Sequence, residues 1–152
     1  WLVSLRQMTR IENAISKKVR YAADLVGEAG KTLCLEPISE PTIPGYFLNN
    51  TWQEVDLMEE IAHSAVKLQL DIFHHQMTHG DVLDMITDLL GRIGHMQVAK
   101  VPDRHEPDVG DLDYWAILSH VDALEYKWWI GCEYSPKGGT KEGLSWITTY
   151  QS

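Results

Sequence analysis

The sequence predicts an α/β fold of the (β/α)8 barrel type, with about four strand–loop–helix units. Short apolar runs alternate with longer segments whose apolar residues recur at helical spacing. Each apolar run ends at or near an acid or an amide. Successive ends are about 26 to 36 residues apart, which is the repeat of a barrel of roughly 250 residues. Strands and helices that alternate in this way form parallel βαβ units.

The first part of the chain contains one helix and the first unit. Apolar residues at helical spacing predict a helix over residues 11–26, with a capping box that starts at Thr9. The apolar run 33–35 predicts the first strand, which ends in Glu36. After a proline-containing loop, a second capping box predicts that residues 51–62 form the next helix, with the first of them as the cap.

The second unit starts with a strand predicted over residues 66–73, where an apolar run ends in Asp71. Residues 74–80 are polar and end in glycine, so we expect a loop there. Asp81 is placed to cap the helix that follows, whose apolar residues recur at helical spacing.

The third and fourth units complete the pattern. A strand is predicted over residues 95–101, and Asp113 is placed to cap the next helix. The strand predicted over residues 128–134 carries Glu133, and a last helical segment ends near Tyr150. A periodic layout of this kind also fits a small doubly wound sheet. Polar side chains at every strand end favour half a barrel, because barrels collect their chemistry there.

The four side chains at the predicted strand ends could together bind a metal ion; they are Glu36, Asp71, Gln97 and Glu133. Three carboxylates and an amide oxygen suit a hard divalent cation such as Mg²⁺ or Mn²⁺. Any one acid can follow a strand simply because loops are polar and helices accept acidic caps. That simpler explanation fits Glu36 and Glu133 less well, because neither is placed as a helix cap.

Two further residues are placed to contact a substrate. His74 follows Asp71 and is the histidine best placed to face the strand ends. Arg104 is the obvious cation for an acidic substrate group, because its guanidinium matches the geometry of a carboxylate.

Length and charge limit the possible functions. The chain has 152 residues, and no linker or composition shift divides it, so residues 1–152 are expected to form a single domain. The formal net charge of −9 argues against nucleic acid or an anionic membrane as a partner, because both require clustered basic residues. No apolar run approaches the ~20 residues that span a bilayer, and no signal peptide is expected.

The two cysteines indicate a compartment. Cys34 and Cys132 both lie within apolar runs, so we expect buried free thiols rather than a disulfide. Free thiols persist in reducing compartments, and a cytoplasmic location follows as the expectation.

Several long motifs resemble those of the hydroxypyruvate isomerase family, from about Val19 to Trp146. They are CLEPI (34–38), LQLDIFH (68–74), GHMQVAKVPDRHEPD (94–108), VPDRHEPDVGDLDY (101–114) and WWIGCEYSPKGGTKEGLSW (128–146). The family belongs to the xylose isomerase-like TIM barrels and includes the similar 2-oxo-tetronate isomerases. The resemblance covers only the C-terminal half of such a barrel.

The resemblance implies a role for each candidate residue. Glu36 and Glu133 would be metal ligands and also the pair that donates and accepts protons. Asp71 and Gln97 match the other two metal ligands, and Gln97 stands where related sugar epimerases carry His. His74 and Arg104 match positions that contact substrate oxygens or the substrate carboxylate.

The implied reaction is the metal-assisted interconversion of hydroxypyruvate, a small 2-oxo acid, and tartronate semialdehyde through an enediolate. The alternatives are a 2-oxo-tetronate isomerase and a non-catalytic half-barrel that acts as an interaction module. A metal-dependent DNA-repair nuclease is disfavoured by the negative charge. Four parallel strands leave open sheet edges, which a homo-oligomer could cover.

Overall fold

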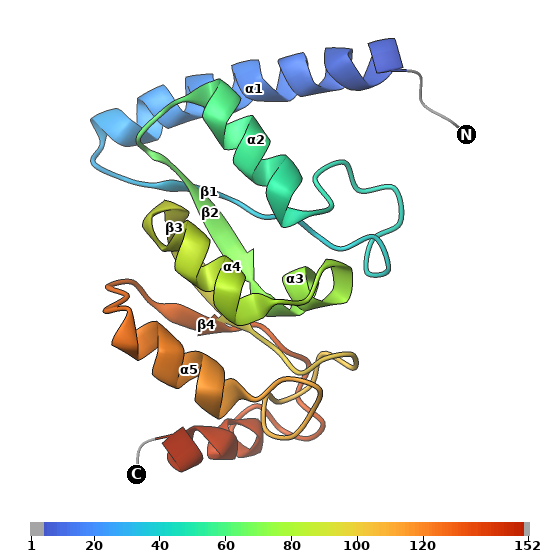
Figure 1. The fold of residues 1–152 in the computed structure, drawn as a ribbon, viewed down its shortest axis with the longest axis vertical. Helices are drawn as coiled ribbons and strands as arrows, with labels where there is room; N and C mark the ends of the chain where they lie inside the picture. The colour runs from blue at the N-terminus through green and yellow to red at the C-terminus, as the bar shows by residue number, and fades with distance from the viewer. Residues whose placement is uncertain (1–4, 151–152) are drawn as a thin grey trace.

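The computed structural model describes residues 5–150 and shows one parallel sheet with helices packed on one of its faces (Figure 1). The sheet order is β1-β2-β3-β4, so each strand lies beside its neighbour in the sequence. The elements are α1 (Leu5–Glu28), β1 (Leu33–Leu35), α2 (Thr51–Ile61), β2 (Val66–Asp71), α3 (Ile72–Thr78), α4 (Val82–Leu89), η1 (Leu90–Arg92), β3 (Ile93–Val98), α5 (Tyr114–Ala123), β4 (Ile130–Cys132) and η2 (Glu142–Tyr150). This order confirms the predicted alternation of strands and helices.

The starts of two helices differ from the predictions. Helix α1 begins at Leu5, so Thr9 lies inside it and does not cap it. The cap of α2 is Asn50, whose side-chain oxygen accepts from the Gln53 N–H at 2.8 Å. The predicted cap, Thr51, is the first helical residue instead, and its hydroxyl lies 2.8 Å from His75 Nδ1.

The two aspartates predicted as caps behave differently. Asp113 caps α5 as expected, because its carboxylate accepts from the Ala116 N–H at 3.0 Å. Asp81 precedes α4 but makes no side-chain capping bond, and its backbone φ of 52° is left-handed. Capping residues typically have an extended backbone, which Asp81 lacks, so its position was predicted correctly and its contact was not.

Strand β1 has the predicted bounds, the other three strands are shorter than predicted, and one predicted loop is a helix. Strand β2 stops at Asp71, and residues 72–78 form α3, where a loop was expected over 74–80. Strands β3 and β4 end before the predicted limits of 101 and 134. The segments that follow them leave the sheet as the loops that carry the site residues.

The core lies between the sheet and the helices. Along β2, Val66, Leu68 and Leu70 are buried against the helices, whereas Lys67 and Gln69 on the opposite face are only partly buried. This is the alternation that a strand imposes. The main cluster joins Leu68, Leu70 and Met96 of the sheet to helices α4 and α5. A second cluster holds α1 and α2 against the β1 side of the sheet.

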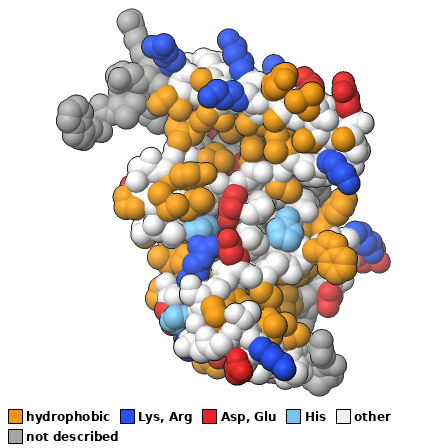
Figure 2. Space-filling view, turned by 180° about the vertical axis from the view of Figure 1, so that it is seen from behind, with side chains coloured by type: hydrophobic (Ala, Val, Ile, Leu, Met, Phe, Trp, Pro, Cys, Tyr) orange, Lys and Arg blue, Asp and Glu red, His pale blue; other side chains and the backbone are white. Residues whose placement is uncertain are grey.

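The face of the sheet opposite the helices is polar (Figure 2). The space-filling view shows acidic, basic and histidine side chains gathered at its centre, with apolar side chains above and below them. In a closed barrel this face would line the interior. Within residues 5–150, β1 and β4 each have one edge that pairs with no other strand.

The two thiols are free but less buried than expected. Cys34 is half-buried, and burial raises the pKa of its thiol. Cys132 is exposed, which contradicts the prediction. It lies in β4 at the open edge of the sheet, where no described element covers it. No helix within the described residues is long and apolar enough to cross a membrane.

Candidate metal and acid–base site

Asp71 lies at the end of β2, and its two oxygens have different partners. Oδ1 accepts from the Phe73 N–H at 2.9 Å and so caps α3. Oδ2 accepts from Arg104 Nη2 at 2.8 Å. Burial raises the pKa of Asp71 to about 6, while Arg104 and the backbone N–H groups oppose that rise. One oxygen of Asp71 therefore caps a helix, as the simpler explanation of acids at strand ends expects. The other oxygen faces the site.

Arg104 connects Asp71 to Glu133 and His74. Its Nη2 lies 2.8 Å from Asp71 Oδ2 and 2.8 Å from Glu133 Oε2, and its Nη1 lies 2.8 Å from His74 Nε2. The guanidinium carbon also lies 4.8 Å from the centre of the Phe73 ring. One cation thus brings together side chains from β2, from α3 and from the loop after β4.

The backbone of Arg104 explains how a loop residue reaches these partners. Its φ is 56°, a left-handed conformation that is uncommon for a non-glycine residue. Its N–H donates to the carbonyl of Lys100 at 2.8 Å, and its own carbonyl accepts from the Ser135 N–H at 2.8 Å. The loop after β3 is therefore tied to the loop after β4, with Arg104 at the junction.

His74 lies between Arg104 and Ser39 and contacts both. Burial, followed by the nearby Arg104 charge, lowers the pKa of His74 to about 4. Arginine can only donate, so His74 Nε2 must accept from Nη1. His74 Nδ1 lies 3.0 Å from the Ser39 hydroxyl and 3.3 Å from the Ser39 backbone nitrogen. His74 was predicted in a loop, but it lies in α3 and still faces the site.

Glu36 follows β1 and is linked to Gln97 of β3 by a residue that the sequence analysis did not single out. Gln69 Nε2 lies 2.8 Å from Glu36 Oε2 and 2.7 Å from Gln97 Oε1. Burial raises the pKa of Glu36 to about 7, and the negative charges of Glu133 and Asp71 add to that rise. Gln69 lies two residues before Asp71, so strand alternation places both side chains on the same face. That spacing was the signal that could have identified it.

The geometry includes a group that could hold a metal ion. Single ligand atoms of Glu36, Asp71 and His74 all lie within 4.8 Å of one another. Gln97 and Glu133 are outside this group. Hydrogen bonds through Gln69 connect Gln97 to Glu36, and hydrogen bonds through Arg104 connect Glu133 to Asp71. The two carboxyl groups with raised pKa values favour a nearby cation, because it would offset the cost of burying their charge. The donor set therefore fits a divalent cation.

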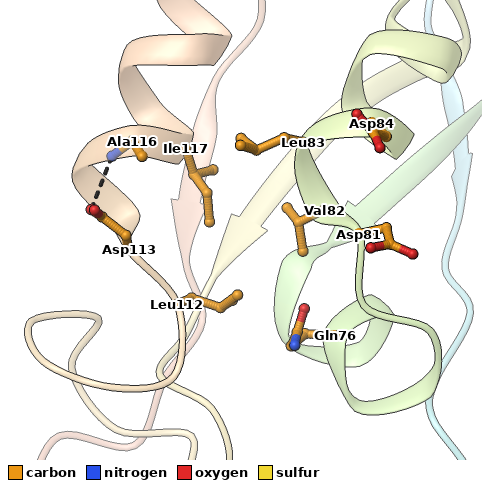
Figure 3. Close-up of a pocket in the computed structure, with 9 residues that line it drawn as sticks. All are labelled: Gln76, Asp81, Val82, Leu83, Asp84, Leu112, Asp113, Ala116 and Ile117. Carbon is orange, nitrogen blue, oxygen red and sulfur yellow. Dashed lines mark hydrogen bonds between the residues drawn. The ribbon is translucent and has the colours of Figure 1, made fainter.

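A separate pocket lies between α4 and the start of α5. It has a volume of about 350 Å³, and Val82, Leu83 and Ile117 are among the residues that line it (Figure 3). Asp113, which caps α5, lies at its edge. None of the predicted site residues lines it, so it is separate from the strand-end site.

Comparisons with known proteins identify the family. A family model described as the xylose isomerase-like TIM barrel matches residues 6–150. The 2-oxo-tetronate isomerase of Pectobacterium atrosepticum is 41% identical over 140 residues, covering 92% of this chain and 52% of that protein. The hydroxypyruvate isomerase of Escherichia coli is 33% identical over 142 residues, covering 93% of this chain and 55% of that protein. The chain spans about half the length of the curated relatives it matches.

Solved structures agree on the fold. A Brucella melitensis protein described as AP endonuclease, family 2 superposes with a TM-score of 0.91 at 38% identity, over 94% of this chain and 55% of that one. The 3-keto-D-glucoside 4-epimerase of E. coli superposes with a TM-score of 0.84 at 19% identity, over 97% of this chain and 57% of that one. At that identity the likeness shows the fold alone. The predicted fold is confirmed as about half of a (β/α)8 barrel, and the chain belongs to the xylose isomerase-like TIM barrel family.

Proposed function

We propose that this chain contributes the metal-binding and proton-transfer residues of an isomerase that interconverts hydroxypyruvate and tartronate semialdehyde. The main support is the convergence of acids from β1, β2 and β4 around Arg104 and Gln69. Relatives named hydroxypyruvate isomerase and 2-oxo-tetronate isomerase support the reaction class.

The metal would be held by the strand-end side chains. We assign Glu36, Asp71, Gln97 and Glu133 as ligands of one divalent cation, Mg²⁺ or Mn²⁺, with the His74 ring beside it. Oxygen donors in this number suit those two ions. A bound cation would stabilise the negative charge that develops on substrate oxygens during isomerisation.

The chain's own acids would move the protons. One glutamate of the pair Glu36 and Glu133 takes a proton from the hydroxyl-bearing carbon beside the substrate carbonyl, and the other returns a proton to the carbonyl carbon. The hydroxyl proton passes to the former carbonyl oxygen, so the hydroxyl-bearing carbon becomes the aldehyde. Without a cation, burial raises the pKa of Glu36 to about 7, and a bound cation would lower it and so favour the carboxylate that accepts the proton.

Arg104 would orient the substrate carboxylate. A guanidinium has five N–H donors, and four of them have partners here: Glu133, Asp71 and His74 through the side-chain contacts, and the Glu133 carbonyl at 3.3 Å from Nε. One Nη1 hydrogen is left for the substrate. His74 lies beside that hydrogen, and it would contact a substrate oxygen by exchanging its Arg104 contact while Ser39 holds the ring.

The reaction can be tested by proton NMR of hydroxypyruvate in D₂O with Mn²⁺ or Mg²⁺. The chain should form tartronate semialdehyde and incorporate solvent deuterium, whereas Glu133→Gln should abolish both. Glu142→Gln, at an exposed acid of η2, is the matched control and should leave the rate unchanged. Deuterium incorporation that persists in Glu133→Gln would contradict the role of Glu133.

The substrate could instead be a four-carbon acid, because 2-oxo-tetronate isomerases are among the relatives at 40% identity or more. Parallel assays with 2-oxo-tetronate and hydroxypyruvate distinguish the two by the ratio of kcat/KM. An abasic-site DNA substrate tests the nuclease activity named for the Brucella protein. We expect no cleavage, because the charge of −9 repels phosphate.

A non-catalytic interaction module is the second candidate function, and the open edges of β1 and β4 favour it. In that case β1 and β4 of one copy would pair with the edge strands of a second copy, and the two sheets would together form a closed barrel of eight parallel strands. Sedimentation equilibrium would then give twice the mass of 17.3 kDa, without turnover. A single-copy mass with turnover would exclude this function. The free thiols suit a cytoplasmic location, which cell fractionation would test.

A further inference from the structure

Gln69 is a side chain that none of the proposed roles includes, although it lies inside the site. It occupies the middle of β2, on the face of the sheet opposite the helices. Its amide nitrogen lies 2.8 Å from Glu36 Oε2 and 2.7 Å from Gln97 Oε1. These two acceptors belong to β3 and to the residue after β1, the strands on either side of β2.

The orientation of the Gln69 amide follows from its neighbours. As a metal ligand Glu36 would be an ionised carboxylate, which only accepts hydrogen bonds, so the Gln69 group that faces it is the NH₂. This NH₂ has two hydrogens, and two acceptors lie within bonding distance of it. Both hydrogens are therefore used, one on each neighbouring strand.

This arrangement also sets the orientation of Gln97. Its Oε1 accepts from Gln69, so the oxygen of the Gln97 amide, and not its nitrogen, is turned toward Gln69 and Glu36. A carbonyl oxygen has two lone pairs, so Oε1 can accept this bond and still bind a cation. Glu36 likewise keeps Oε1 free while Oε2 is held by Gln69.

We infer that Gln69 is a positioning residue that presents Glu36 and Gln97, on either side of it, to one divalent cation. It would bind neither the metal nor the substrate itself. Side chains that hydrogen-bond metal ligands typically contribute 10- to 100-fold in metal affinity. The register places Gln97 directly beside Asp71, so fixing Gln97 also sets its spacing from that carboxylate. The inference rests on the metal site proposed above.

Two variants test this role by isothermal titration with Mn²⁺. Gln69→Met keeps the length of the side chain and removes its donors, and Gln69→Asn keeps the amide but is one carbon too short to reach both acceptors. Each should weaken Mn²⁺ binding at least tenfold. The thermal midpoint in EDTA should change little, because the side chain is only partly buried.

Lys67→Met is the matched control, since Lys67 lies on the same face of the same strand and its Nζ bonds the carbonyl of Gly91. It should bind Mn²⁺ like the unaltered chain. Equal Mn²⁺ affinity in Gln69→Met and the unaltered chain overturns the role of Gln69 alone. Failure of the unaltered chain to bind Mn²⁺ overturns the proposed metal site, and this inference with it.

A second measurement does not involve metal. The side-chain amide resonances of Gln97 in a ¹⁵N NMR spectrum should shift in Gln69→Met, because Oε1 loses its donor. They should stay in place in Lys67→Met. Resonances that do not move in Gln69→Met would overturn the inference even if its Mn²⁺ affinity fell.

Discussion

Arg104 Nη2 donates to Asp71 Oδ2 at 2.8 Å, and this contact connects the loop after β3 to the end of β2. The Asp71 side chain has no exposed surface, and that of Arg104 is 23% exposed. The same nitrogen donates to Glu133, so one guanidinium offsets the charge of two carboxylates. The stability of the strand-end site therefore depends on this one side chain.

Arg104→Met should destabilise the fold. The change leaves the buried Asp71 charge without its cation, which typically costs about 3 kcal/mol, and somewhat less here because Arg104 keeps contact with water. Urea unfolding at pH 7 measures the free-energy change. Arg92→Met is the control, because its pair with Glu59 is exposed and should contribute less than about 1 kcal/mol. Equal losses of unfolding free energy in the two variants would show that the contact with Asp71 stabilises the fold no more than an exposed ion pair does.

Glu54→Gln should stabilise the protein at alkaline pH. Glu54 in α2 is fully buried, and neither of its oxygens has a hydrogen-bond partner among the described residues. Burial, with help from the Glu36 charge, raises the pKa of Glu54 from 4.5 to about 10. Between these values the folded state holds a proton that the unfolded state has lost, so stability falls as pH rises.

The amide cannot ionise, so this fall should disappear in Glu54→Gln. The variant should exceed the unaltered chain by more than about 1 kcal/mol at pH 8 and lose the advantage near pH 4. Urea unfolding across that range measures the effect, with the exposed Glu60→Gln on the same helix as the control. A parallel pH dependence in Glu54→Gln and the unaltered chain would contradict the buried, neutral state of Glu54.

Asn50→Ala should cost about 1 kcal/mol of unfolding free energy, because it removes the bond that caps α2. Thr51→Val should act differently, since Thr51 is not the cap. It removes the hydroxyl that lies 2.8 Å from the buried His75 Nδ1. The chemical shifts of the His75 ring should therefore move in Thr51→Val and not in Asn50→Ala. Urea unfolding measures the stability of the two variants, and NMR measures the His75 ring shifts. The same His75 shifts in both variants would contradict the prediction.

Gly94→Ala should destabilise the sheet. A Cβ at Gly94 would lie 2.7 Å from Lys67 Cβ and 3.1 Å from Cys34 Sγ, and the Lys67 Cβ is fixed by its backbone. We expect a loss of about 2 kcal/mol, typical of overpacking. Gly91→Ala is the control, because nothing lies within 4 Å of the added atom. Thermal unfolding of the two variants measures the difference in stability between them. Equal stability would show that β1, β2 and β3 can move apart to make room for the added atom.

The sequence was sufficient to predict much of the fold. Short apolar runs between segments of helical spacing predicted the order of strands and helices, because the strands bury apolar residues such as Leu68 and Leu70 against the helices. The same pattern could not predict α3. That helix has only seven residues, and its start is capped by Asp71, which the folded strand end holds in place.

The candidate site was predictable only in part. Acids and amides after apolar runs identified Glu36, Asp71, Gln97 and Glu133 as neighbours. The contacts that join them were not predictable, since Arg104 reaches Asp71 from a left-handed loop position and Gln69 looks like an ordinary strand residue in sequence. Both links depend on the register of β2 and β3 and on the path of a loop, which local sequence does not specify.

The central claim is that the strand ends form one cation site. Its most direct test is a calorimetric titration of Mn²⁺ into the unaltered chain and into the double variant Glu36→Gln, Glu133→Gln. If the strand ends form one cation site, the unaltered chain binds one Mn²⁺ per chain and the double variant loses that binding. Equal stoichiometry and affinity in the two proteins would show that these glutamates do not share a metal ion.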